Sequence, residues 1–63
     1  MENKYKLNDI VSFKIQNEII TGNIVIIDRN GTFEYPDEVC YDILSNNTLW
    51  KHIKESMIHK VSV

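Results

Sequence analysis

The stretch from Ile19 to Ile27 limits most strongly what this chain can fold into. It is rich in isoleucine and valine, and Gly22 interrupts it. β-Branched side chains pack well on an extended backbone, and a run this short with a glycine inside it disfavours a helix. We therefore predict a long strand with a bend or bulge at Gly22, where the missing side chain lets the strand turn a crowded corner.

Alternating apolar and polar residues predict further strands on both sides of this run. Val11, Phe13 and Ile15 alternate with polar residues, which is the period-2 pattern of a half-buried strand. The pairs Asn30-Gly31 and Asn46-Asn47 tolerate positive φ and mark chain reversals. We predict five strands, near residues 10–15, 18–27, 39–44, 48–53 and 58–63, with a single helical turn at 54–57 before the last strand.

Residues 48–60 also fit a helix, and this alternative stays open at the level of the sequence. Leu49, Ile53 and Met57 recur at a spacing of four residues, which is the spacing of one helix face. Thr48 precedes them as a candidate N-cap. The run is short, however, and residues 61–63 return to a strand pattern.

The chain is short enough to hold one core only. Its 63 residues place it near the lower limit for independent folding, so we treat residues 1–63 as a single domain. The lone cysteine, Cys40, cannot form an internal disulfide, which leaves packing or association between copies to supply stability. We find no signal peptide and no apolar stretch of membrane-spanning length, and therefore expect a cytoplasmic protein without a membrane partner.

Charge and residue types weigh against two classes of function. The formal net charge of -2 differs from the basic excess of a general nucleic-acid binder, so nucleic acid is a disfavoured partner. Cys40, His52 and His59 are the only cysteine and histidines, and their spacing matches neither a nucleophile with its base nor a zinc motif. We therefore expect a protein that is not an enzyme, with no catalytic residues, no metal site and no cofactor.

Several short segments carry a resemblance to known proteins. They are Tyr5-Lys6-Leu7-Asn8-Asp9-Ile10-Val11-Ser12-Phe13, Gly22-Asn23-Ile24, Tyr41-Asp42-Ile43 and Ile53-Lys54-Glu55-Ser56-Met57-Ile58. On them the chain resembles an SH3-like barrel, which implies five short strands with a tight turn or one-turn helix before the last. It is also similar to short proteins of Gram-positive bacteria and their phages that carry Gly-Asp-x-Val and Lys-His-Ile-x-Glu-Ser-x-Ile motifs.

The chain departs from such barrels at Asn8, where they usually carry glycine. Asparagine is the next best residue for a left-handed turn, so the predicted fold is unaffected. SH3-like barrels bind proteins, peptides, RNA and small molecules, so the resemblance implies no particular function. Function has to be argued from the surface.

An uninterrupted alternation along the strands separates an inner from an outer set of apolar residues. The inner set is Val11, Phe13, Ile15, Ile24, Ile26, Tyr41, Ile43, Leu49, Ile53 and Ile58. The outer set is Val25, Ile27, Leu44 and Trp50, and apolar residues gathered on an outer face indicate an interface. We predict interface residues Val25, Ile27, Leu44 and Phe33; a register shifted by one residue, the alternative, exchanges the two sets.

A tryptophan and nearby cations suggest a ligand site on the fourth predicted strand. A tryptophan can stack on a nucleobase while lysine pairs with a phosphate, and the same side chain can anchor a protein partner. In the alternative interpretation Trp50 caps the barrel and the lysines are solvated. The predicted ligand-binding residues are Trp50, Lys51, His52, Lys54, Arg29 and Tyr35.

Three functions follow from these features, in order of preference. The first is a phage-encoded, homo-oligomeric binding protein that sequesters a small anionic ligand, such as a nucleotide-type immune signal, at a protomer interface. The second is an adaptor or inhibitor that binds a host protein through Phe33, Tyr35, Trp50 and an acidic loop. RNA binding by an SH3-like module is third, because of the acidic charge balance.

Overall fold

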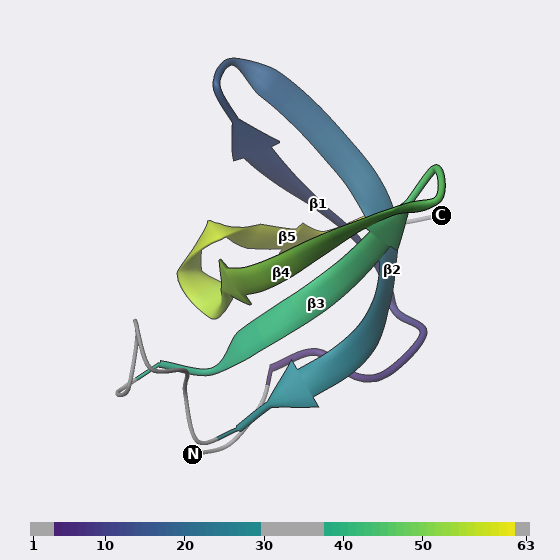
Figure 1. Cartoon of the computed structure of the whole chain (residues 1–63). Helices are drawn as coiled ribbons and strands as arrows, with labels where there is room; N and C mark the ends of the chain where they lie inside the picture. Colours follow the sequence, from purple (N-terminus) through teal and green to yellow (C-terminus); the bar gives the residue numbers. More distant parts are fainter. Residues whose placement is uncertain (1–3, 30–37, 62–63) are drawn as a thin grey trace.

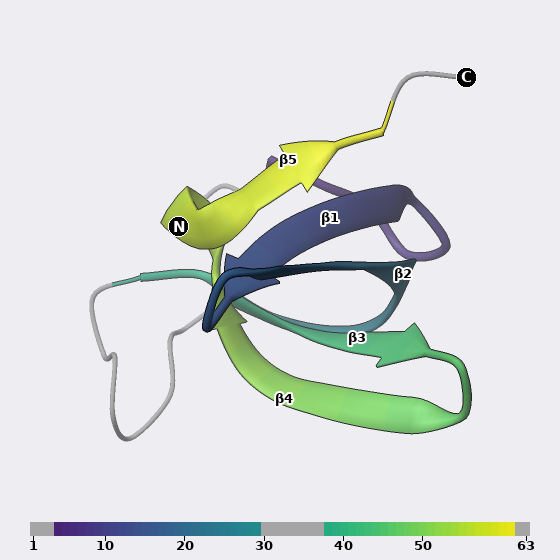
Figure 2. The ribbon, with the colours of Figure 1, turned by 90° about the horizontal axis from the view of Figure 1, so that it is seen from above.

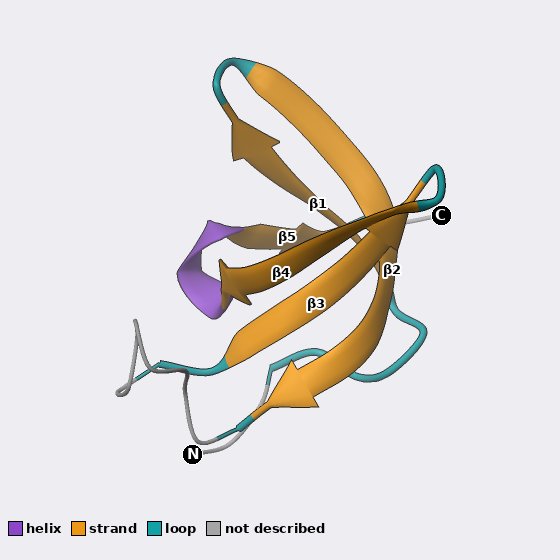
Figure 3. Cartoon of the chain, in the orientation of Figure 1, coloured by secondary structure: helices purple, strands orange, loops and turns teal. Residues whose placement is uncertain are grey.

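The chain folds into β-strands, as a computed structural model that describes residues 4–29 and 38–61 shows (Figures 1 and 3). The prediction of a mainly β chain with one helical turn before the last strand is confirmed, and the alternative helix over residues 48–60 is wrong. The elements are β1 (Ile10–Ile15), β2 (Glu18–Asp28), β3 (Cys40–Ser45), β4 (Thr48–Lys54), a 3-10 turn (Glu55–Met57) and β5 (Ile58–Lys60).

The strands form one antiparallel sheet in the order β4-β3-β2-β1-β5. The long strand β2 pairs with β1 through its first half and with β3 through its second half. Figure 2 shows the sheet curving so that β5 and β4 lie at opposite margins. This arrangement agrees with the five-stranded SH3-like barrel predicted from the sequence.

Two-residue turns join β1 to β2 and β3 to β4. Gln16 and Asn17 have φ of 48° and 67°, and Asn46 and Asn47 have φ of 49° and 64°. Positive φ at both central residues is the pattern of a type I′ turn, whose twist matches that of the strands it joins. Such tight turns fix the register of both hairpins, and with it the face on which each side chain lies.

A bulge in β2 reverses the predicted faces of its second half. The register against β3 slips between Ile24 and Ile26, so Val25 is the extra residue. Ile24 is buried and Ile26 is exposed, whereas Ile27 packs against the core. The prediction that Ile26 fills the barrel and Ile27 lies outside is therefore wrong, because an uninterrupted alternation does not include the extra residue.

A second bulge, in β4, brings Trp50 to the inner side. Two residues of β4, between Trp50 and Ile53, lie opposite Asp42 alone. His52 takes a φ of 58° there, and its backbone N–H donates to Asp42 Oδ1 at 3.1 Å. Ile53 is buried and Trp50 packs against the core, while Leu49 is exposed. The predicted positions of Leu49 inside and Trp50 outside are wrong for this reason.

The core is a cluster of buried apolar side chains enclosed by the curved sheet. The predicted positions in β1, β3 and β5 are confirmed, and Tyr5 and Val39 add to them from outside the strands. Ile15, Ile20, Ile27, Trp50 and Met57 pack against the cluster while partly exposed. The cluster itself consists of Tyr5, Val11, Phe13, Ile24, Val39, Tyr41, Ile43, Ile53 and Ile58.

Gly22 lies where β2 passes from its pairing with β1 to its pairing with β3. A Cβ at this position would overlap the carbonyl oxygen of Leu44 and lie 3.0 Å from the Cγ2 of Ile43. Glycine is therefore required for the backbones to approach so closely. This confirms the predicted crowded corner at Gly22, although the bulge itself lies at Val25.

Replacing Gly22 with alanine tests this close approach. We expect Gly22→Ala to lower the free energy of unfolding by about 1–3 kcal/mol, because the added methyl group pushes β3 away from β2. Urea denaturation measures the change. Thr21→Ala, an exposed neighbour in the same strand, is the control and should stay within about 0.5 kcal/mol of the wild type. Equal losses for the two variants would contradict the requirement for glycine.

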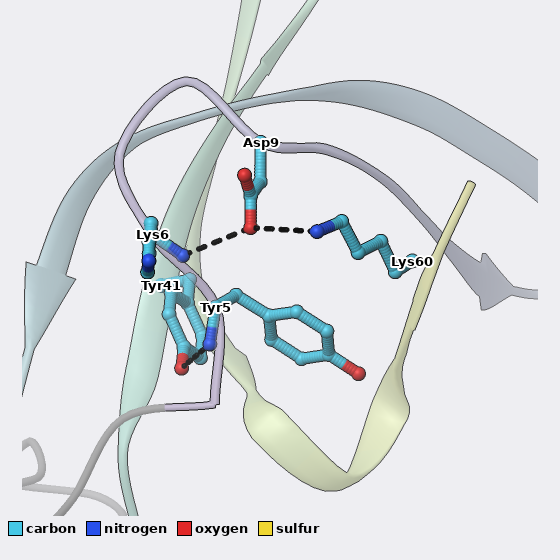
Figure 4. A network of polar contacts seen from close by, with 5 residues as sticks. All are labelled: Tyr5, Lys6, Asp9, Tyr41 and Lys60. Atoms are coloured by element: carbon cyan, nitrogen blue, oxygen red, sulfur yellow. Dashed lines mark hydrogen bonds and ion pairs between the residues drawn. The ribbon is translucent and has the colours of Figure 1, made fainter. Parts of the chain in front are cut away.

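Hydrogen bonds of tyrosine hydroxyls connect the segment before β1 with β3 and with the start of β5. The Tyr5 hydroxyl donates to the carbonyl of Ile58 at 2.8 Å. The Tyr5 backbone N–H donates to the Tyr41 hydroxyl at 3.2 Å (Figure 4). The Tyr41 hydroxyl in turn donates to Glu55 Oε2 at 2.6 Å. The two rings meet edge to face with centroids 5.6 Å apart. These contacts close the barrel where strand pairing ends.

A turn at residues 6–9 leads this segment into β1. Asn8 has a φ of 72°, which confirms the left-handed turn predicted for it, and its N–H donates to the carbonyl of Ile24 at 2.9 Å. Asp9 Oδ2 accepts the backbone N–H of Lys6 at 3.0 Å and lies 3.8 Å from Lys60 Nζ (Figure 4). The Asp9 carboxylate thus links the turn to β5.

The Tyr41 hydroxyl makes the free energy of unfolding fall at alkaline pH. Burial, and then the hydrogen bond to Glu55, raise the pKa of Tyr41 to about 12, whereas an unfolded tyrosine titrates near pH 10. A raised pKa stabilises the fold fully below about pH 10, and this stabilisation is lost as pH rises towards 12. Across this range we expect the free energy of unfolding, measured with urea, to fall more steeply for the wild type than for Tyr41→Phe. Parallel pH profiles would contradict this.

Candidate binding surface

An apolar row crosses the outer face of the sheet from β1 to β4. The register places Ile10 opposite Asn23, Asn23 opposite Leu44, and Leu44 opposite Leu49. Ile10, Leu44 and Leu49 are 44%, 38% and 42% exposed, whereas Val11, Ile43 and Trp50 beside them belong to the core or pack against it. We call Ile10, Asn23, Leu44 and Leu49 the outer row.

The tight turn between β3 and β4 draws two members of the outer row together. A two-residue hairpin turn makes Ser45 and Thr48 the first hydrogen-bonded pair, so Leu44 and Leu49 form the next, non-hydrogen-bonded pair. Cα atoms in such a pair are only about 4.5 Å apart, and the side chains are correspondingly close. The two leucines therefore form one continuous apolar surface.

Charged groups and one further apolar residue, Ile26, border the outer row. The next outward positions along β2 and β3 are Ile26, which is 51% exposed, and its partner Asp42. Lys51 and His52 are exposed on β4 beside them, and the Asp42 carboxylate accepts a hydrogen bond from the backbone N–H of His52. An apolar centre with a charged rim is the composition of surfaces that bind other macromolecules.

The predicted interface residues lie in different places. Leu44 is exposed on the outer face as predicted, whereas Ile27 packs against the core and Val25 is a half-buried bulge residue. Phe33 lies outside the described residues. Ile10 and Leu49 were not predicted for the interface. Continuing the alternation of β1 backwards from Val11 would have indicated Ile10, whereas the bulge in β4 conceals Leu49.

The predicted ligand-binding residues do not converge around Trp50. The Trp50 ring packs edge to face on Phe13 with centroids 5.7 Å apart, as in the alternative interpretation in which it caps the barrel. Lys51 and His52 are exposed, but Trp50 faces the inner side of the sheet. Lys54 is the last residue of β4, Arg29 follows the last residue of β2, and Tyr35 lies outside the described residues. Their roles in binding stay predictions.

Reactive side chains are dispersed in the described part of the chain. The Cys40 thiol is buried and donates to the carbonyl of Glu38 at 3.6 Å. Hydrogen bonds from Ser56, including its backbone N–H at 3.0 Å, hold the pKa of Glu38 below its usual value, and Lys54 adds to this. Among residues 4–29 and 38–61, no three histidine, cysteine or acidic side chains are grouped so as to hold a metal ion.

Comparisons with known proteins give no assignment. No family model matches the chain, and neither the curated proteins nor the solved structures include a match. The resemblance to short proteins of Gram-positive bacteria and phages therefore stays a prediction. Within the described residues, no helix has the length and apolar character to cross a membrane.

Proposed function

We propose that this protein is a non-enzymatic binding domain that works in a complex with other protein chains and binds them through the outer row. The observation that supports this is the contiguous apolar pair Leu44 and Leu49 on the neighbouring strands β3 and β4, in one row with Ile10, which Asn23 of β2 separates from the pair. Single exposed apolar residues are ordinary on protein surfaces, whereas an aligned and contiguous set indicates a contact surface.

The size of the chain supports the same conclusion. The core is small, and a domain of this length commonly gains stability from a partner when it has no disulfide or metal. Covering Leu44 and Leu49 removes the exposed parts of two adjacent apolar side chains from water. Because the two residues are 38% and 42% exposed, each contributes about 1 kcal/mol, which is less than a leucine buried from full exposure. Association through the outer row would therefore stabilise both the complex and the fold.

Photo-crosslinking from the outer row tests this function. We expect a chain with benzoylphenylalanine in place of Leu44 to form protein crosslinks when irradiated in the cells that express it. The same group at Ile19, which is 71% exposed on β2 but outside the outer row, is the matched control and should form few. Gel electrophoresis with mass spectrometry identifies the products. Equal yields from the two positions would contradict binding through the outer row.

A second candidate function is the capture of a small anionic ligand, such as a nucleotide signal, by an oligomer. The observation that favours it is the pair of neighbouring exposed side chains Lys51 and His52, at the β4 end of the outer row. Lysine ammonium groups pair with phosphate, and a ligand held between two copies would meet this pair twice.

Calorimetric titration of the full chain with cyclic nucleotides and ADP-ribose tests this candidate. We expect saturable heat with at least one of them, and a loss of about tenfold in affinity for Lys51→Ala, because one charged contact contributes about 1.5–3 kcal/mol. Lys14→Ala, an exposed lysine on β1, is the control and should bind as the wild type does. The absence of heat with these ligands, or equal affinities for both variants, would remove the candidate.

A further inference from the structure

β4 is a margin of the sheet, and within the described residues it pairs with β3 alone. Figure 2 shows it on the side of the sheet opposite β5. An open strand edge presents backbone N–H and C=O groups with which another strand can pair. We propose that two copies of the chain pair antiparallel through β4, about a two-fold axis at Trp50. This inference rests on the proposed function, because it names a second copy as one of the chains bound and uses Leu49, the member of the outer row that lies on the edge strand.

The β3–β4 hairpin fixes which backbone groups of β4 face the open edge. Thr48 and Trp50 occupy the hydrogen-bonded positions against β3, so their N–H and C=O groups point towards β3. The corresponding groups of Leu49 and Lys51 then point away from β3. A second copy bonds to β4 through Leu49 and through Lys51, which is the first residue of the bulge.

Three antiparallel registers with a two-fold axis use the backbone groups of Leu49 and Lys51. They differ in which side chains lie opposite each other and in how many hydrogen-bonded pairs they form. An axis at Lys51 places the two lysines directly opposite each other, which is unfavourable. An axis at Leu49 gives one complete hydrogen-bonded pair and sets Lys51 against Asn47, a residue of the turn. An axis at Trp50 gives two complete pairs, in each of which Leu49 lies opposite Lys51 of the second copy. The observations favour the axis at Trp50.

The side chains on both faces suit this axis. On the outer face, the aliphatic part of Lys51 from the second copy covers Leu49 and extends the apolar surface, while the ammonium group stays in water. On the inner face, the two half-buried Trp50 side chains come directly opposite each other across the axis, as a pair of aromatic residues. Each exposed apolar group at the edge thereby gains a partner.

The bulge at His52 limits the pairing to one short segment. Lys51 and His52 together lie opposite Asp42, and His52 has a φ of 58° with its N–H bonded to Asp42, so pairing with another strand cannot continue beyond Lys51. Pairing is confined to residues 48–51, and the two-fold axis uses the same segment of both copies. Because the axis uses the β4 edge of both copies, no third chain can join through β4, and β5 is the margin at each end of the joined sheets.

Charge-swap variants of the full chain, studied by sedimentation equilibrium, test this dimer. We expect Leu49→Lys to raise the dissociation constant at least about tenfold, because it places lysine opposite Lys51 of the second copy. The double variant Leu49→Lys with Lys51→Glu should restore dimerisation, and Leu49→Glu should strengthen it. Leu7→Lys, which changes an exposed leucine outside β4, is the control and should dimerise as the wild type does. Circular dichroism confirms that each variant is folded.

Fluorescence of Trp50, the only tryptophan of the chain, gives an independent readout on dilution. We expect its emission to shift as the dimer dissociates, at the same concentration as in sedimentation. A wild type that stays monomeric throughout would overturn the inference, and a weakened Leu49→Glu dimer would overturn the axis at Trp50. If the chain is monomeric but residue 44 crosslinks to another protein, self-pairing fails and the proposed function stands. If residue 44 forms no crosslinks, the proposed function fails as well.

Discussion

The close approach of the Gly22 backbone to the carbonyl of Leu44 is the constraint on which the rest of the structure depends. It occurs where β2 leaves its pairing with β1 and begins its pairing with β3, so it sets the angle between the two halves of the sheet. The inner side of this corner holds Ile24 and Ile43 in the core, and its outer side aligns Asn23 with Leu44. This one backbone contact thus positions residues of the core on one face of the sheet and residues of the outer row on the other.

Much of the fold could be predicted because it is encoded locally. Alternation and asparagine-rich turns indicate the strands, and a glycine within a β-branched run indicates the corner. The two bulges could not be predicted in this way. They depend on how β2 and β4 pair with β3, and the faces of Ile27 and Trp50 depend on them in turn. The candidate surface was predicted only in part for the same reason. Leu44 follows the regular alternation of β3, whereas the extra residue of β4 lies between Leu49 and Ile53, so an alternation that puts Ile53 in the core places Leu49 on the wrong face.

The bulge at His52 connects the packing of the core with the properties of the sheet edge. Positive φ is uncommon for a residue other than glycine and asparagine, and here the hydrogen bond to Asp42 stabilises it. The extra residue lets both Trp50 and Ile53 reach the core from a single strand. It also interrupts the regular edge of β4. One local distortion therefore completes the hydrophobic cluster and shortens the segment available to another strand.

The two type I′ turns also bear on the order in which the chain folds. Each joins strands that are adjacent in sequence, and hairpins of this kind form in about 1–10 μs. The pairing of β1 with β5, by contrast, joins Phe13 to Ile58, and bringing such distant residues together costs more chain entropy. We therefore expect Leu44 and Leu49 to meet early, with their hairpin, and the contacts of Tyr5 with Tyr41 and Ile58 to form later. The apolar pair on the outer face would then exist before Tyr5 joins the segment ahead of β1 to β5.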